Sequence, residues 1–239
     1  MGKEFVGQVQ KFFPKLSEIW VIARREDRLL ELRKAFGEKI RPLALDLTDD
    51  KDLQSLQEAF EAEDPNIRVL INAAGNGFIG DIMELPVTDL TSTIDLNVRT
   101  LTEVTCIALP YIGNEGRIIN LASASAFIPQ PGFAVYAASK SYVLSFSRAL
   151  GKEVAKRDIS VTAVCPGPVK TEFFKVAERH QKMAERKKKY MSDPRKVVRA
   201  AMQDALKRRD VSVYSFSMKA VRLITKILPH RLILTFWGA

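Results

Sequence analysis

Residues 67–75 read IRVLINAAG, an apolar run that ends in an asparagine and three small residues. Apolar runs without alternation are typical of strands in a parallel sheet that is covered on both faces. Small residues directly after such a strand allow the main chain to approach a bound ligand closely. This stretch therefore predicts an α/β fold with a ligand site at the carboxyl end of the strand.

Similar runs alternate with helical patterns along the chain, which favours a doubly wound parallel sheet with helices on both faces. The predicted strands are 19–22, 40–45, 67–72, 117–122, 159–165 and 211–214. The predicted helices include 26–36, 50–62, 88–111, 136–157 and 194–208. No internal repeat or long linker divides the chain, so its 239 residues fit one domain, 1–239.

Polar and turn-forming residues follow three of the other predicted strands. Ser123 follows 117–122, the sequence PGPVKT follows 159–165, and Arg24 follows 19–22. The carboxyl ends of parallel strands meet at one edge of the sheet, where ligands bind in open α/β folds. These residues are therefore expected to line one site.

The most informative local pattern is YAASK, which runs from Tyr136 to Lys140. Four residues apart on a helix, the two side chains lie on one face. A free tyrosine has a pKa of about 10, and a neighbouring ammonium group favours the phenolate and lowers that pKa. For this short pattern alone, accidental pairing on a helix face is the better explanation.

The pattern gains specificity from its companions, which keep their order and spacing. Asn97 precedes Ser123, Ser123 stands thirteen residues before Tyr136, and NAAG occupies 72–75. From Gly2 to about Tyr214, the chain resembles the short-chain dehydrogenase/reductase family. The resemblance implies a Rossmann-type fold and an oxidoreductase that interconverts a carbonyl and an alcohol by hydride transfer.

The resemblance also implies a role for each of four catalytic residues. Tyr136 would pass a proton to the carbonyl oxygen, and Lys140 would lower the pKa of Tyr136 and hold the nicotinamide ribose. Ser123 would steady the developing oxyanion. Asn97 would hold a water molecule in the proton path, although its side chain may equally be satisfied by helix backbone.

The cofactor-binding residues that the resemblance implies lie at four strand ends and at the N-terminus. Val169 and Thr171 would hold the carboxamide end, and Asp46 would contact the adenine unless it only caps the following helix. Arg24 stands where NAD-binding members carry an acidic residue, so NADP(H) is favoured over NAD(H). Besides Tyr136 and Lys140, the other implied contacts are Gly2, Leu47, Asn72, Ala73, Ala74 and Gly75.

The first residues, MGKEF, match only the end of the family's TGxxxGxG loop and the helix after it. The sequence therefore predicts a sheet without the family's first strand, with open edges at the strands 19–22 and 67–72. This departure leaves an alternative open, in which the chain is a truncated, non-catalytic relative that acts as a binding or scaffold protein.

The C-terminal part of the chain contains a basic segment, an expected lid and an amphipathic tail. A net charge of +9 comes largely from 182–199, with eight Lys or Arg residues, which is interpreted as a solvated helix face rather than a nucleic-acid site. The segment 172–193 is expected to form a substrate lid. The amphipathic tail 215–239 is expected to pack over the substrate side, with peripheral membrane contact through Trp237 as a minor alternative.

The remaining expectations concern the compartment, the partners and the metals. Only Cys106 and Cys165 are present, and the first residues do not show the basic and apolar regions of a secretory signal, so a reduced, cytoplasmic protein is expected. The resemblance implies a small carbonyl or alcohol substrate, a homo-oligomer and a site that needs no metal.

Overall fold

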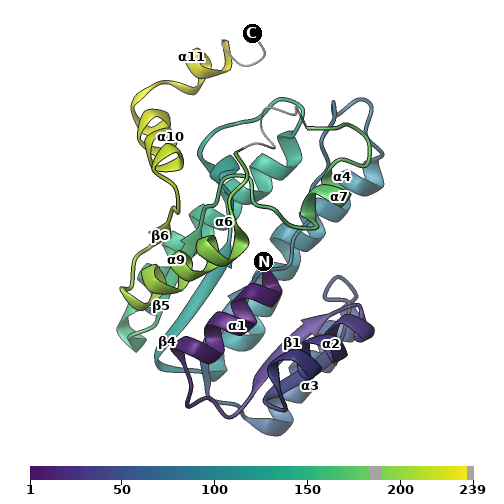
Figure 1. The fold of residues 1–239 in the computed structure, drawn as a ribbon, viewed down its shortest axis with the longest axis vertical. Helices are drawn as coiled ribbons and strands as arrows, with labels where there is room; N and C mark the ends of the chain where they lie inside the picture. The colour runs from purple at the N-terminus through teal and green to yellow at the C-terminus, as the bar shows by residue number, and fades with distance from the viewer. Residues whose placement is uncertain (184–189, 236–239) are drawn as a thin grey trace.

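The computed structural model describes residues 1–183 and 190–235 as alternating strands and helices (Figure 1). The strands are β1 Ile19–Ala23, β2 Ile40–Ala44, β3 Ile67–Asn72, β4 Ile112–Leu121, β5 Ser160–Val164 and β6 Val211–Ser212. The helices are α1 Gly2–Phe12, α2 Glu26–Phe36, α3 Asp50–Glu63, α4 Val87–Ile94, α5 Thr100–Ala108, α6 Ala134–Glu153, α7 Phe173–Ala177, α9 Pro194–Leu206, α10 Phe216–Ile227 and α11 His230–Thr235.

The prediction of six strands is confirmed within the described residues, and so is the helical stretch predicted over 88–111. The structure divides that stretch into α4, a π-helical turn at Asp95–Arg99, α5 and a short 3₁₀ turn at Leu109–Tyr111. Pro110 lies in that last turn, where its fixed φ angle and missing N–H end the regular helix. The chain then enters β4, which starts at Ile112, five residues before the strand predicted at 117–122.

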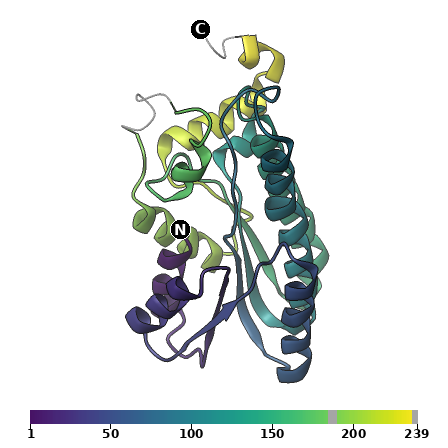
Figure 2. The same cartoon turned by 90° about the vertical axis from the view of Figure 1, so that its right-hand side faces the viewer.

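All strand pairs are parallel, and helices cover both faces of the sheet (Figure 2). Helices α1 and α9 pack on one face through a core that includes Phe5, Val9, Val164 and Met202. Helices α5 and α6 pack on the other face, where Leu101 and Val143 join a second core. Because both faces are covered, the strands carry continuous apolar runs, as the sequence predicted.

The strands form two separate groups, β1–β2 and β3–β4–β5–β6. Within residues 1–183 and 190–235, no strand pairs with the edge of β1 or of β3 that the sequence predicted to be open. Residues of both edges, from Ile19 to Ala23 and from Ile67 to Asn72, line the same large cavity. The cavity therefore extends from the carboxyl ends of the strands into the space between the two groups.

Local sequence signals fix several helix starts. Asp49 caps α3 by accepting hydrogen bonds from the main-chain N–H groups of Lys51 and Asp52, at 2.9 and 3.3 Å. Ser215 caps α10 in the same way through the N–H of Met218, at 3.2 Å. Each cap satisfies main-chain donors that the first turn of a helix leaves free, which defines where the helix begins.

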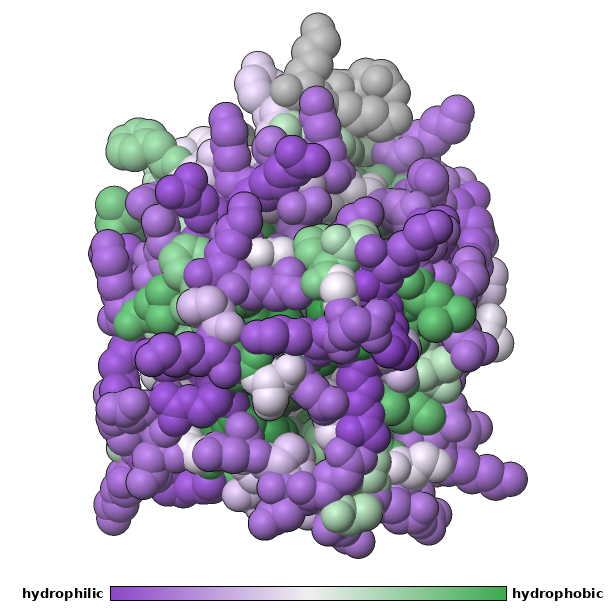
Figure 3. All heavy atoms as spheres, turned by 60° about the horizontal axis from the view of Figure 1, so that its bottom comes forward, coloured by the Kyte–Doolittle hydropathy of each residue, from purple (hydrophilic) through white to green (hydrophobic). Residues whose placement is uncertain are grey.

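The face of the molecule around α1 and the β1–β2 pair is mostly hydrophilic (Figure 3). Figure 3 shows the end of the molecule that lies at the bottom of Figure 1, where hydrophilic side chains dominate and hydrophobic atoms are visible between them. None of the helices in residues 1–183 and 190–235 combines the length and the apolar character needed to cross a bilayer.

Candidate active site

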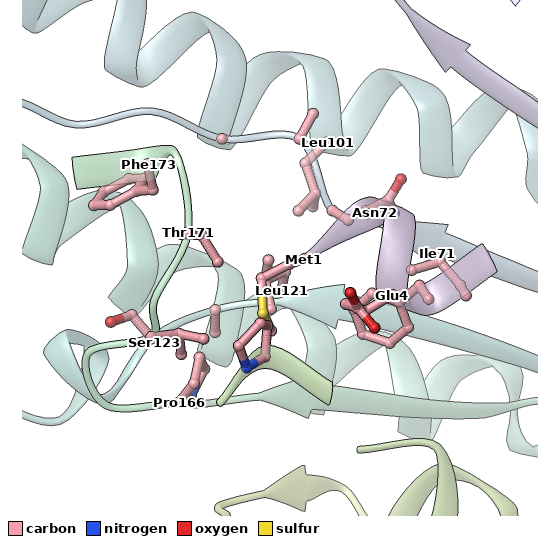
Figure 4. Close-up of a pocket in the computed structure, with 18 of the residues that line it drawn as sticks. Met1, Glu4, Ile71, Asn72, Leu101, Leu121, Ser123, Pro166, Thr171 and Phe173 are labelled. Carbon is pink, nitrogen blue, oxygen red and sulfur yellow. The ribbon is translucent and has the colours of Figure 1, made fainter. Parts of the chain in front are cut away.

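Nearly all of the residues that the sequence predicts to be catalytic or cofactor-binding line one cavity of about 2240 Å³. It is lined by the N-terminus of α1, by the ends of β1 to β5, and by α6, α7 and α10. In Figure 4, Ser123, Thr171 and Phe173 lie on one side, Asn72 and Ile71 lie on the other, and Met1 lies between them. Asn97 is the one predicted catalytic residue outside the cavity lining.

Ser123, Tyr136 and Lys140 come together because the end of β4 lies against the first turns of α6. Ser123 follows β4 and caps a short 3₁₀ turn, accepting a hydrogen bond from the N–H of Ser125 at 3.1 Å. Tyr136 and Lys140 lie one helical turn apart on α6, and the Ser123 side chain is near enough to the Tyr136 hydroxyl to lower its pKa. Ser123 and Lys140 are buried, 8% and 3% exposed. The structure thus confirms that these three side chains are neighbours.

Burial dominates the acid–base properties of the group. It raises the pKa of Tyr136 to about 12, and the neighbouring Ser123 side chain offsets this only in part. Burial also lowers the pKa of Lys140 to about 8. The Lys140 ammonium group lies 5.7 Å from the centre of the Tyr136 ring and donates a hydrogen bond to the carbonyl oxygen of Leu121 at 2.9 Å. That Lys140 lowers the pKa of Tyr136 stays a prediction.

The Tyr136 ring is held by Phe173 of the expected lid and by two neighbours that the sequence analysis did not predict. Phe133 stacks on it with ring centres 4.2 Å apart, and Phe173 of α7 lies 5.3 Å away at a tilt of 48°. On a further side is Gly77, where an added Cβ atom would lie 2.4 Å from Cδ2 of Tyr136. Only the cluster of small residues after β3 hinted at this close approach, because NAAGNG places glycine at 75 and 77.

Asn97 is buried in the π-helical turn and binds the loop that follows β3. Its side-chain amide donates to the carbonyl oxygen of Asn76 at 2.8 Å and to the Ser139 hydroxyl at 3.0 Å. Its side-chain oxygen accepts from the Asn76 N–H at 3.1 Å. The side chain is therefore satisfied by protein groups, chiefly loop backbone rather than the helix backbone that the sequence suggested. Single π turns of this kind are frequent at functional sites.

The loop after β3 approaches Lys140 and Asn97 so closely that glycine is required at 75. A Cβ atom there would lie 2.9 Å from the Asn97 side-chain oxygen and 3.2 Å from Nζ of Lys140. Ala73 and Ala74 line the cavity beside it. Asn72 also lines the cavity, but its amide donates to Thr105 at 2.9 Å and to Asn120 at 2.8 Å, which joins β3 to α5 and β4.

At the β1 end of the cavity, Arg24 and Asp46 lie side by side. Their closest charged atoms are 3.7 Å apart, and the Arg24 side chain is 71% exposed. Asp46 does not cap α3; it accepts hydrogen bonds from the Thr48 N–H and hydroxyl, at 3.0 and 2.7 Å. Although burial opposes it, these bonds and Arg24 lower the pKa of Asp46. Leu47 also lines the cavity, and its carbonyl oxygen accepts a hydrogen bond from Thr100 at 2.9 Å.

The other nominated cofactor residues also reach the cavity. Val169 and Thr171 follow β5, and Val169 forms a parallel bridge with Ser192. Gly2 starts α1, whose N-terminus has no side-chain cap, and an added Cβ at Gly2 would meet nothing within 4 Å. Uncapped main-chain amides at a helix N-terminus favour an anion such as a phosphate group.

The expected lid is described in part, because 184–189 lie outside the described residues. Its first helix, α7, places Phe173 over Tyr136. Glu172 lies 3.7 Å from a guanidinium nitrogen of Arg25, across the cavity on the α2 side. At the far end, His180 contacts Asp89 of α4 at 2.6 Å. These contacts fasten 172–180 over the cavity from both sides, and sequence reasoning missed Asp89 and His180.

The positively charged and N–H groups around the cavity fit a dinucleotide with phosphate groups. A guanidinium group lies at the β1 end, an uncapped helix N-terminus lies near the middle, and a buried ammonium group lies by Ser123 and Tyr136. Within the described part of the chain, no group of three or more His, Cys, Asp or Glu side chains is arranged to hold a metal ion.

Comparison with known proteins gives the family. The model of the short chain dehydrogenases matches residues 7–182, so the chain belongs to this family of oxidoreductases. An uncharacterized oxidoreductase of Staphylococcus epidermidis is 30% identical over 157 residues, 65% of this chain and 68% of that protein. An NADP-dependent 3-hydroxy acid dehydrogenase of Schizosaccharomyces pombe is 34% identical over 151 residues, 62% of this chain and 58% of that protein.

Solved structures agree on the fold. A short-chain dehydrogenase from Streptomyces avermitilis superposes with a TM-score of 0.79 at 22% identity, covering 99% of this chain and 91% of the other. The doubly wound Rossmann-type fold predicted from the sequence is therefore confirmed. Matches to the curated relatives above span about two thirds of their length or less.

Proposed function

We propose that the protein is an NADP(H)-dependent oxidoreductase that interconverts a carbonyl and an alcohol, with Ser123, Tyr136 and Lys140 at its catalytic centre. One observation carries this proposal. The three side chains meet at the end of β4 in the same cavity that holds Arg24 and the N-terminus of α1. A proton donor, a hydrogen-bond donor and a cation beside a phosphate-binding helix end are the groups that this chemistry needs.

Each group would have its own step in the reaction. With its pKa raised to about 12, Tyr136 is protonated at neutral pH and can donate its proton to a carbonyl oxygen. The Ser123 hydroxyl, which lies beside Tyr136, would donate a hydrogen bond to the same oxygen and stabilise its developing charge. A bound NADP(H) supplies or accepts the hydride.

Lys140 and Asn97 would position the reacting groups. Lys140 is anchored on the carbonyl oxygen of Leu121, where its remaining N–H donors can bind the ribose hydroxyls of the cofactor. Asn97 holds the loop 72–77 against α6, which keeps Gly77 against Tyr136. The side-chain amide of Asn97 already donates to Asn76 and Ser139. A water molecule bound by Asn97 would have to share this amide with them.

The choice of NADP(H) over NAD(H) rests on Arg24. Its guanidinium group is exposed at the end of β1 and can pair with a 2′-phosphate through two parallel hydrogen bonds. The Schizosaccharomyces pombe relative is NADP-dependent. In this proposal Asp46 and Leu47 border the adenine, Gly2 the pyrophosphate, and 72–75, Val169 and Thr171 the nicotinamide half.

The test is Tyr136→Phe, which removes one hydroxyl and keeps the ring between Phe133 and Phe173. Turnover of NADPH with a panel of carbonyl substrates should fall by at least about 100-fold, the low end of the effect of a general acid. NADPH affinity, measured by calorimetry, should stay within about threefold of wild type. A mutant that keeps wild-type kcat on the best substrate would contradict the assignment.

A second candidate function is a non-catalytic binding protein, and the two-part sheet favours it. Among the described residues no strand joins β1 to β3, and Met1 lies in the middle of the cavity. The test adds an apolar strand and a TGxxxG turn ahead of Gly2. If this extension raises NADPH affinity and turnover, the protein is an enzyme whose activity is limited by the open edges of β1 and β3. If it restores neither, the binding protein is the better description.

Three further expectations remain predictions. The two free cysteines fit a reduced compartment such as the cytoplasm. A homo-oligomer and the lack of nucleic-acid binding are testable by light scattering and by salt-dependent retention on a nucleic-acid column.

A further inference from the structure

The outer face of α10 carries an exposed apolar stripe. Phe216, Leu223 and Ile227 are 86%, 60% and 70% exposed. Their spacing of seven and four residues places them on one face of the helix. Beyond α10, the same end of the molecule exposes Leu228 and Leu232, at 45% and 53%. Large apolar side chains gathered in this way mark an interaction surface rather than ordinary surface.

The opposite face of α10 already packs against the body of the protein, so the exposed stripe is not the face that joins the hydrophobic core. Met218 packs against the core on the α6 side of the sheet, and Val221 and Thr225 line the cavity. The contact at Met218 is close, because an added Cβ at Gly167 would lie 2.9 Å from its sulfur. Helix α10 is therefore held on the body with its apolar stripe facing outward, and α10 and α11 lie at one end of the molecule (Figures 1 and 2).

Charge decides what the stripe can meet. Lys219 and Lys226, both exposed and seven residues apart, flank it along one side. Arg222 and Arg231 add two more cations, and the sequence contains no Asp or Glu after Asp210. A helix with an apolar face beside a basic face matches the interfacial helices that lie in the headgroup region of anionic bilayers.

A second copy of the chain fits this surface less well. Dimers usually form around a two-fold axis, which places the same patch of each subunit against its counterpart. Two α10 helices packed in this way would bring Lys219 and Lys226 close to their own copies. The charges would then repel, since no acidic residue in 211–239 can compensate them.

We propose that α10, extended by Leu228 and Leu232, docks the protein on anionic membrane surfaces. The apolar stripe enters the headgroup boundary, and the flanking lysines pair with lipid phosphates. The protein then binds the bilayer peripherally, with its cavity beside the docked helix.

The test is flotation of the full chain with vesicles of phosphatidylcholine alone or with 30% phosphatidylglycerol, in about 0.15 M salt. Wild type should float with the anionic vesicles only. Lys219→Gln/Lys226→Gln should lower the partition coefficient by roughly 30-fold, from about fivefold per lysine. Leu223→Ser/Ile227→Ser should abolish flotation. All four side chains are exposed, and thermal denaturation would verify that both variants fold.

The matched control is Lys34→Gln/Lys51→Gln, which removes the same charge from exposed positions on α2 and α3. It should float like wild type. If it loses as much binding as the α10 pair, or if wild type stays in the pellet, the proposal is overturned. The same holds if the α10 variants bind normally, because the basic segment 182–199 would then be responsible. A wild-type dimer that Leu223→Ser/Ile227→Ser converts to monomer, without vesicle binding, would identify the stripe as a self-association surface instead.

Discussion

Gly77→Ala should damage catalysis while adding only one methyl group. Gly77 has no positive φ angle, so alanine can adopt its backbone conformation. The added Cβ, however, would lie 2.4 Å from Cδ2 and 2.9 Å from Cγ of Tyr136. The effect of the substitution therefore acts on the ring of the proposed proton donor and not on the loop itself.

The size of the effect follows from the room around that ring. Tyr136 must move by about 1 Å before the contact reaches the 3.4 Å of ordinary packing. Phe133, stacked at 4.2 Å, and Phe173, at 5.3 Å, limit where it can go. Overpacking of this kind costs about 1–3 kcal/mol of stability. A displacement of about 1 Å in a reacting group can cost on the order of 100-fold in rate.

The assay is steady-state turnover of NADPH with the best carbonyl substrate of the panel, together with urea denaturation. Gly151→Ala in α6 is the matched control. Its added Cβ would lie 3.5 Å from Val161 of β5, which is an ordinary packing distance. The control should keep full activity and gain about 0.5–1 kcal/mol from its better helix propensity. For Gly77→Ala, kcat should fall by about 100-fold and the free energy of unfolding by about 1–3 kcal/mol. Activity within twofold of wild type would refute the reasoning that Gly77 positions Tyr136.

Three other predictions test separate parts of the site. Arg24→Asp should weaken NADPH binding far more than NADH binding, because a second carboxylate would join Asp46 near the 2′-phosphate. Calorimetry with both cofactors tests this, and equal losses of affinity would mean that Arg24 does not contact the 2′-phosphate. Asn97→Ala should lower the free energy of unfolding by about 2–3 kcal/mol in urea denaturation, because the part-buried N–H and C=O of Asn76 lose their partner. A loss under about 0.5 kcal/mol would argue against this bracing role. Burial lowers the pKa of Lys140 from 10.5 to about 8, so above pH 8 the unfolded chain holds a proton that the folded chain has released. The free energy of unfolding of wild type relative to Lys140→Met should therefore rise by about 2 kcal/mol between pH 8 and pH 10, and a flat difference would mean that the lysine is hydrated.

The sequence by itself determined the sheet and the identity of the candidate site. Buried parallel strands need continuous apolar runs, so all six strands could be located from residue type alone. A spacing of four residues on a helix places Tyr136 and Lys140 on one face, whatever the rest of the fold does. Ser123 and the loop 72–75 could be placed beside them because the carboxyl ends of parallel strands share one edge.

Only the tertiary structure decided how those residues are held and charged. Burial by segments distant in sequence raises the pKa of Tyr136 and lowers the pKa of Lys140. Asn97 in the π-helical turn is hydrogen-bonded to Asn76, 21 residues away, and no local pattern predicts this contact. The need for glycine at 77 arises from a ring on another element. Each of these features is a contact between distant parts of the chain, which sequence spacing does not encode.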